Sequence, residues 1–166
     1  MERSTAMAEQ KTNVMRTLTQ KKISYIAYEY PHGDAPVDGV TVAKITGLDP
    51  DTVFKTLVCR GASKIIYVFC IPVAAELDLK KAAKAVGEKS IAMIHVSEIT
   101  ALTGYVRGGC SPVGMKKQYH TTFHESVNGL DTVIVSAGKI GYQVALAPKA
   151  LIDLVRANTA DIITED

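Results

Sequence analysis

The chain has 166 residues, of which 47% are hydrophobic and 22% are charged. This composition is typical of a globular protein with a packed core and excludes a disordered or fibrous chain. Nineteen basic and seventeen acidic side chains leave a net charge of +2, so nucleic-acid binding would have to rest on local clusters of cations. No apolar run reaches the roughly 20 residues of a membrane span, and residues 1–10 lack the apolar stretch of a signal peptide.

The three cysteines are Cys59, Cys70 and Cys110, and no C-x-x-C motif is present. Their number and spacing indicate neither a disulfide framework nor a thiol redox motif, so we expect a cytoplasmic protein. The length favours one domain. We expect it to cover residues 9–166, after a disordered or extraneous segment over residues 1–8.

Periodicity predicts the elements of the first half of the chain. Two runs rich in β-branched residues flank Gly61-Ala62-Ser63, which predicts a hairpin. In chain order we expect an amphipathic helix over 11–22 with Val14, Met15 and Leu18 inward, a strand over 24–30, a loop over 31–39, a short helix capped by Thr41 and ending at Gly47, a helical turn at Asp49-Pro50, and strands over 53–60 and 64–71.

In the second half, Asp78 is expected to cap a helix that ends at Gly87. Its inward residues would be Leu79, Ala82, Ala83 and Val86, with Lys80, Lys81 and Lys84 in solvent. After it we expect a strand over 91–94, a helix over 97–102, strands over 119–124, 132–136 and 142–146, and a last helix opened by Pro148. Because helices and strands interleave while hairpins also occur, we predict an α/β fold with a curved mixed sheet.

Lys55 stands out within the predicted strand 53–59. Alternate residues of a strand share a face, so Lys55 lies with Val53, Leu57 and Cys59. An ammonium among apolar neighbours costs free energy unless it is paired or reaches water. Lys55 is therefore either a lysine that reaches solvent at a sheet edge, or a cation in a cleft that holds a phosphate or a developing negative charge.

Residues 104–117 combine four glycines with three cations. Glycines let backbone N–H groups approach a ligand closely, which indicates a phosphate or oxyanion cradle, with a structural turn as the alternative. The segment is not a Walker A loop, because Met115 follows Gly114. Residues 136–141 could add a hydroxyl and further amides, although a hairpin turn explains them equally well.

The cysteines and histidines are candidate nucleophiles and metal ligands. Cys110, beside this basic segment, could attack a substrate with a histidine as base, but cysteine is among the most buried residue types and is usually inert. His120 and His124 are four residues apart, which on a strand separates them by about 13 Å and prevents them from sharing an ion. We therefore expect no metal site.

Four separate strings, in this order, resemble the YbaK/EbsC family of aminoacyl-tRNA deacylases, which are related to the editing domain inserted in bacterial prolyl-tRNA synthetases. They are Val-Phe-Lys-Thr-Leu-Val at 53–58, Leu-Asp-Leu-Lys-Lys-Ala-Ala-Lys at 77–84, Thr-Gly-Tyr-Val-Arg-Gly-Gly-Cys-Ser-Pro at 103–112 and Val-Ser-Ala-Gly-Lys at 135–139. The resemblance extends from about residue 11 to residue 166. It implies a curved mixed sheet or partial barrel flanked by helices, with a substrate cleft and without a metal or organic cofactor.

The resemblance also implies an activity, the removal of cysteine wrongly attached to tRNA(Pro), and in some members from tRNA(Cys). Cysteine and proline have similar volumes, which a synthetase pocket distinguishes poorly, so a second site corrects the error. The thiol of the cysteinyl group itself attacks the ester carbonyl and releases the tRNA and a cyclic thiolactone. The implied partners are the acceptor end of an aminoacylated tRNA and prolyl-tRNA synthetase.

Carried over position by position, the resemblance implies a catalytic set of Lys55, Gly108 and Ser136. Lys55 would contact the terminal nucleotide or the ester, Gly108 would offer an amide, and Ser136 would position the aminoacyl group. Substrate binding is implied for Tyr30, Gly109, Ser111 and Gly138, and phosphate or tRNA binding for Arg107, Lys116 and Lys139. Together with Lys55, these cations predict a basic cleft.

The chain departs from the family pattern at two places. Ile140 stands where many relatives have arginine, and residues 32–40 lack an expected aromatic side chain. Both leave the range of accepted amino acids open, so a deacylase for Ala-tRNA or Ser-tRNA is an alternative. A non-catalytic module that binds tRNA or a nucleotide, and a hydrolase that uses Cys110, are the others.

Overall fold

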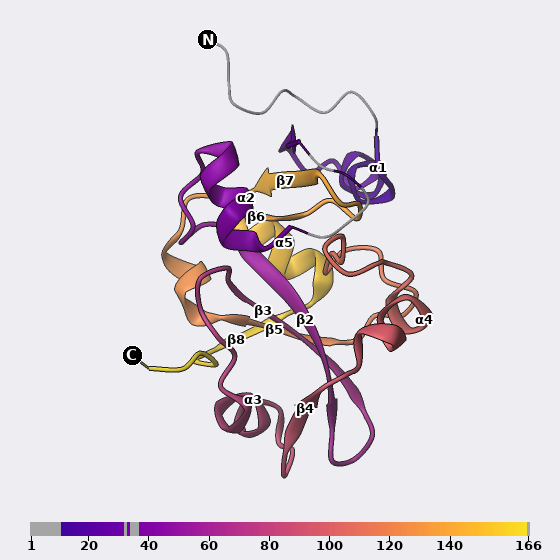
Figure 1. Ribbon diagram of the computed structural model, residues 1–166, viewed down its shortest axis with the longest axis vertical. Coiled ribbons are helices and arrows are strands. Elements are labelled where there is room, and N and C mark those ends of the chain that lie inside the picture. Colours follow the sequence, from indigo (N-terminus) through magenta and orange to yellow (C-terminus); the bar gives the residue numbers. More distant parts are fainter. Residues whose placement is uncertain (1–10, 32, 34–36, 166) are drawn as a thin grey trace.

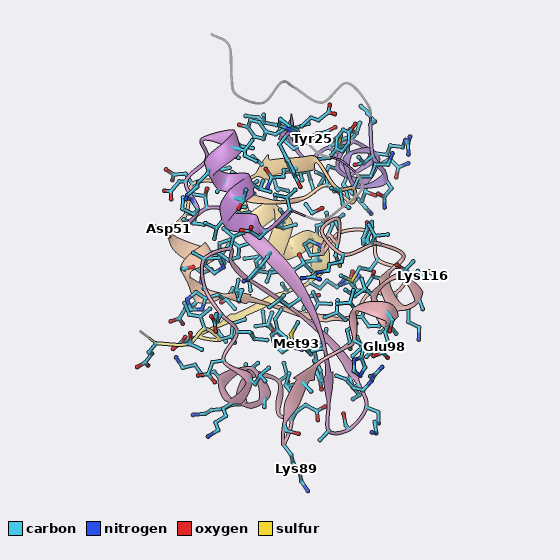
Figure 2. The ribbon with its side chains drawn as sticks, in the orientation of Figure 1. Tyr25, Asp51, Lys89, Met93, Glu98 and Lys116 are labelled. Carbon is cyan, nitrogen blue, oxygen red and sulfur yellow. The ribbon has the colours of Figure 1, made fainter. Side chains whose placement is uncertain are left out.

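The computed structural model of the protein describes residues 11–31, 33 and 37–165. Within these ranges five α-helices accompany two β-sheets (Figure 1). The segment expected over residues 1–8 lies outside the described residues, and so do residues 32 and 34–36 of the expected loop 31–39. The long axis of the molecule runs from the region of Tyr25 to that of Lys89, at opposite ends of the view in Figure 2.

The smaller sheet has three antiparallel strands in the order β1 (Tyr25–Glu29), β7 (Tyr142–Leu146) and β6 (Val133–Ser136). Because successive side chains alternate between faces, Val135 and Val144 belong to the main core, whereas Ile134 and Ala145 pack on the other face in a small separate cluster. This second face borders the cleft described below.

The larger sheet has the strand order β4-β2-β3-β5-β8. Its strands are β4 (Ile91–Met93), β2 (Phe54–Gly61), β3 (Ile66–Pro72), β5 (His120–His124) and β8 (Asn158–Ala160). The β2–β3 hairpin and the β2–β4 pair are antiparallel, while β3–β5 and β5–β8 are parallel. The sheet is mixed, which confirms the predicted fold class.

The two sheets meet where β2 begins. Val53 forms a parallel bridge with Ile134 of β6, and the Ile134 amide donates to the Thr52 carbonyl at 2.9 Å. The Val53 carbonyl accepts from the Val73 amide, also at 2.9 Å. One short stretch of chain therefore ties both sheets together.

Helices cover the sheets and are closed by recognisable caps. They are α1 (Asn13–Gln20), α2 (Gly39–Thr46), α3 (Leu79–Val86), α4 (Ile99–Thr103) and α5 (Pro148–Val155), with 3₁₀ turns η1 (Val96–Glu98) and η2 (Glu125–Gly129). As predicted, Asp78 caps α3, Gly87 ends it, and Pro148 stands at the start of α5. Helices α1 and α5 contribute to the main core with β1, β6 and β7.

The structure corrects several sequence-based expectations. Asp38, rather than Thr41, caps α2, because its carboxylate accepts from the Thr41 amide. Leu79 is 42% exposed rather than inward. The Lys81 side chain, expected in solvent, donates to Asp161 and to the Ile163 carbonyl. Strand β8 was not predicted, since its three residues carry no clear alternation.

The cap of α3 yields a prediction for stability. Asp78 Oδ1 accepts from the amides of Lys80 and Lys81, both at 3.0 Å. Asp78→Ala leaves these donors without that acceptor and should lower the free energy of unfolding by about 1 kcal/mol, measured by urea denaturation. The exposed Asp131 makes no side-chain hydrogen bond to any described residue, so Asp131→Ala should leave the midpoint nearly unchanged. Equal midpoints for the two variants would contradict the capping role.

Candidate active site

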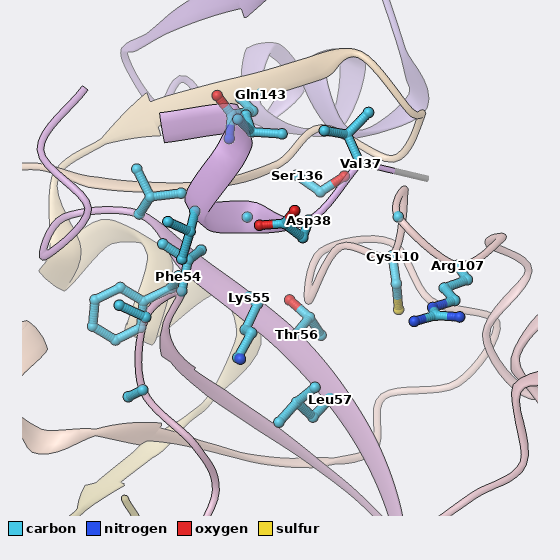
Figure 3. A pocket seen from close by; sticks show the side chains of 18 of the residues that line it. Val37, Asp38, Phe54, Lys55, Thr56, Leu57, Arg107, Cys110, Ser136 and Gln143 are labelled. Atoms are coloured by element: carbon cyan, nitrogen blue, oxygen red, sulfur yellow. The ribbon is translucent and has the colours of Figure 1, made fainter. Parts of the chain in front are cut away.

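A cleft of about 960 Å³ opens between the smaller sheet, the start of α2 and the start of β2 (Figure 3). Residues 73–76 and 107–110 complete its walls. Five of the residues predicted for the site lie on it: Tyr30, Lys55, Arg107, Gly108 and Ser136. They come from four distant parts of the chain, so the fold assembles them.

Lys55 reaches this cleft from β2. Its cross-strand partner is Ile71, and Leu57 and Cys59 of the same strand face belong to the apolar cluster beneath α3, as the alternation predicted. Burial lowers the pKa of the Lys55 ammonium, and the negative charges of Glu76 and Asp38 act against that shift. No described carboxylate lies within ion-pair distance of Lys55. The side chain is thus a partly desolvated cation in a cleft rather than a lysine at an open edge.

Asp38 lines the same cleft from the start of α2 (Figure 3), and its charge acts on Lys55. Its Oδ1 accepts from the Thr41 amide at 3.0 Å and its Oδ2 from the Thr41 hydroxyl at 2.7 Å. These hydrogen bonds, the hydroxyl's first, lower the pKa of Asp38, so the carboxylate is charged at neutral pH. Glu76 brings a second carboxylate to the same cleft.

Ser136 and Gln143 line the cleft from the smaller sheet, where they are cross-strand partners. The Ser136 hydroxyl oxygen accepts from the Gly138 amide at 3.1 Å, which leaves its proton available to a ligand. Gly138 has a φ of 94°, so the tight turn after β6 depends on glycine. Sequence reasoning missed Gln143, although an isolated glutamine in an otherwise apolar strand was a usable signal.

Tyr105 closes the glycine-rich segment on itself and ties it to helix α1. Its hydroxyl donates to the Val113 carbonyl and accepts from Asn13 Nδ2, the latter at 2.8 Å. Gly109 packs so closely on the next segment that a β-carbon would lie 3.0 Å from Ile140 N. The two glycine motifs that the sequence singled out therefore lie side by side, and Gly108 faces the cleft.

The other predicted site residues do not line this cleft. Ser111 is fully buried and its hydroxyl accepts from the Val113 amide, a role within its own loop. Gly109 and Gly138 shape turns, while Lys116 and Lys139 are exposed; Lys116 donates to the Ala101 carbonyl. The charged lining is Lys55 and Arg107 with Asp38 and Glu76, so the cleft is of mixed charge rather than basic as expected.

Cys110 lines the cleft, but its surroundings make it a poor nucleophile. Burial raises the pKa of its thiol to about 11, so almost none of it is thiolate at neutral pH. Burial also raises the pKa values of Cys59 and Cys70 to about 12. A mechanism through a thiol of the protein is therefore disfavoured at all three positions.

No group of three or more His, Cys, Asp or Glu side chains in the described part of the chain could hold a metal ion. Within that same part, no helix is long and apolar enough to cross a membrane.

Comparison with known proteins identifies the family of the chain. The aminoacyl-tRNA editing domain matches residues 37–154. The chain is 44% identical, over 95% of its length and 96% of the relative's, to EbsC of Enterococcus faecalis, a protein described as a candidate Cys-tRNA(Pro)/Cys-tRNA(Cys) deacylase.

Two solved structures share the fold. A candidate trans-editing enzyme for prolyl tRNA synthetase has a TM-score of 0.78 at 24% identity, covering 94% of this chain and all of that one. The hypothetical protein APE2540 has a TM-score of 0.81 at 18% identity, covering 92% of this chain and all of that one. With a family match over most of its length, and with a relative that is 44% identical over nearly the whole chain, this chain belongs to the aminoacyl-tRNA editing domain family.

Proposed function

We propose that the protein is a trans-editing deacylase that removes cysteine from mischarged tRNA(Pro), and also acts on Cys-tRNA(Cys). The observation that carries this proposal is the partly desolvated Lys55 ammonium, which lies in one cleft with Gly108 and Ser136. The 44% identity to a relative described as a deacylase for these two substrates supports the choice of amino acid.

The cleft suits the 3′ end of an aminoacylated tRNA. A volume of about 960 Å³ falls in the range of ordinary ligand pockets, enough for an adenosine with a small aminoacyl group. The α-ammonium of that group is complementary to the Asp38 and Glu76 carboxylates. Lys55 is complementary to the oxygen on which negative charge develops when the ester carbonyl is attacked.

In the proposed reaction, the sulfur of the cysteinyl group attacks its own ester carbonyl carbon. A carbon–sulfur bond forms, the bond from that carbon to the ribose oxygen breaks, and the thiol proton passes to the ribose oxygen. The products are free tRNA and a cyclic thiolactone, which water then opens. Lys55 stabilises the oxyanion, and the cleft walls fold the thiol toward the carbonyl, which raises its effective concentration.

Substrate delivery forms the second part of the proposal. We infer that the protein acts in the cytoplasm on the acceptor end of the tRNA and that prolyl-tRNA synthetase presents the substrate. The net charge of +2 supports this, since a weakly charged protein binds the tRNA body weakly by itself. A structural relative is described as a candidate trans-editing enzyme for prolyl tRNA synthetase. Pull-down of the synthetase with tRNA(Pro) present and absent tests the assembly.

Substitution of Lys55 tests the catalytic assignment. Lys55→Met removes the cation and should lower kcat/KM for Cys-tRNA(Pro) roughly 10²–10³-fold, as loss of an oxyanion-stabilising group does. Burying an ammonium costs free energy, so the variant should unfold at the same or a higher temperature than the wild type. Lys89→Met, at the far end of the molecule (Figure 2), serves as the matched control. Full activity of Lys55→Met would refute the site.

The pH dependence of the wild-type rate gives a further test. If the ammonium of Lys55 is needed, activity must fall as pH rises through its pKa, which burial places below the usual 10.5. Arginine keeps its charge in this range, so Lys55→Arg should lack that decline relative to its own rate at neutral pH. Release of radiolabelled cysteine, corrected for hydrolysis without enzyme, measures both profiles. The same alkaline decline in the variant would assign it to another group.

Replacing the cysteines tests whose thiol reacts. Changing Cys59, Cys70 and Cys110 together to Ala should leave the rate near that of the wild type, provided that circular dichroism shows an intact fold. Ala-tRNA(Pro), which has no thiol, should resist the wild-type enzyme. A loss in the triple variant as large as that of Lys55→Met would point to a protein nucleophile, and rapid release of alanine would point to attack by water.

A further inference from the structure

Gln143 is a buried polar side chain in the wall of the cleft. It lies on β7 and is only 7% exposed, and no described residue forms a hydrogen bond to its Oε1 atom. Buried polar atoms in folded proteins are nearly always paired, and an exception calls for an explanation. The position of Gln143 among the residues that line the cleft indicates that a ligand supplies the missing partner.

The neighbours of Gln143 define which part of a ligand it would meet. Its cross-strand partner is Ser136, and both side chains line the cleft from the smaller sheet, while Asp38 lines it from the start of α2 and Lys55 from β2 (Figure 3). The smaller sheet therefore contributes neutral polar side chains to the cleft, and α2 and β2 contribute charged ones. The ammonium and the ester of an aminoacyl group are complementary to the charged groups, which leaves its side chain for Ser136 and Gln143.

The hydrogen-bonding groups of an amide are complementary to those of a thiol or a hydroxyl. Gln143 offers two N–H donors and an acceptor oxygen, and a thiol both donates and accepts. The terminal torsion of glutamine has a broad two-fold preference, so the amide can turn either end toward the ligand. A methyl group in place of the thiol would leave the buried amide without a partner, and sites of this kind reject such analogues.

We propose that Gln143 is a specificity-determining residue that binds the side-chain sulfur of the aminoacyl group. The inference rests on the proposed function for the identity of the ligand. It adds selection at the binding step to the selection made by the reaction itself. The Gln143 amide binds the thiol before the thiol reacts and holds it beside Ser136.

Binding of unreactive analogues tests this. The probes are 3′-amino-3′-deoxyadenosine acylated with cysteine and the same compound acylated with 2-aminobutyrate, in which a methyl group replaces the thiol. Calorimetry should show the wild type binding the cysteinyl compound roughly three- to tenfold more tightly, as expected for one neutral hydrogen bond. Gln143→Met, similar in volume but apolar, should bind both equally. Gln143→Glu retains an acceptor and should keep part of the preference.

Gln20→Met, at the exposed end of α1, is the matched control and should keep the wild-type ratio. If Gln143→Met does not fold, Gln143→Asn replaces it, since the shorter amide should also lose the preference. Equal binding of the two probes by the wild type, or an unchanged ratio in the Gln143 variants, would overturn the proposal. These outcomes do not depend on turnover, whereas the proposed function fails only if the wild type leaves Cys-tRNA(Pro) intact.

Discussion

The junction of the two sheets at Thr52 and Val53 is the constraint on which the cleft depends. The carbonyl of Thr52 accepts from the smaller sheet and that of Val53 from the chain after β3. The junction thereby places the start of β2 beside the smaller sheet, and residues of both line the cleft. Lys55 follows two residues later, on the same face of the strand as Val53, so the junction also places the ammonium at the cleft.

The charge arrangement in the cleft supports the proposed role of Lys55. Burial lowers the pKa of this half-buried lysine, and no described carboxylate is near enough to form an ion pair with it. Groups with perturbed pKa values in a cleft are common at active sites. Hydrogen bonds from Thr41 lower the pKa of Asp38 and keep its carboxylate charged. The same carboxylate caps α2, so it fixes the backbone at the start of the helix and places a negative charge at the cleft.

The cysteines and Gln143 together indicate which groups react and which groups select the substrate. The protein's own thiols are buried and have raised pKa values, which suits a protein that must not compete with the thiol of its substrate. In the proposed function the reactive group arrives with the substrate, and the protein supplies a cation, backbone amides and a shaped wall. An unpaired amide in that wall would favour the substrate that carries the thiol.

Local patterns in the sequence were enough to place most helices and strands, the caps at Asp78 and Gly87, and the unusual lysine on an apolar strand. They also indicated the family, because its four strings occur in order along the chain. That Asp38, Lys55, Gly108 and Gln143 line one cleft could not be predicted in this way. It depends on contacts such as the bridge from Val53 to Ile134, which joins residues far apart in the chain. The mixed charge of the cleft has the same origin: periodicity shows which face a side chain takes, but only the packing of distant strands decides what it faces.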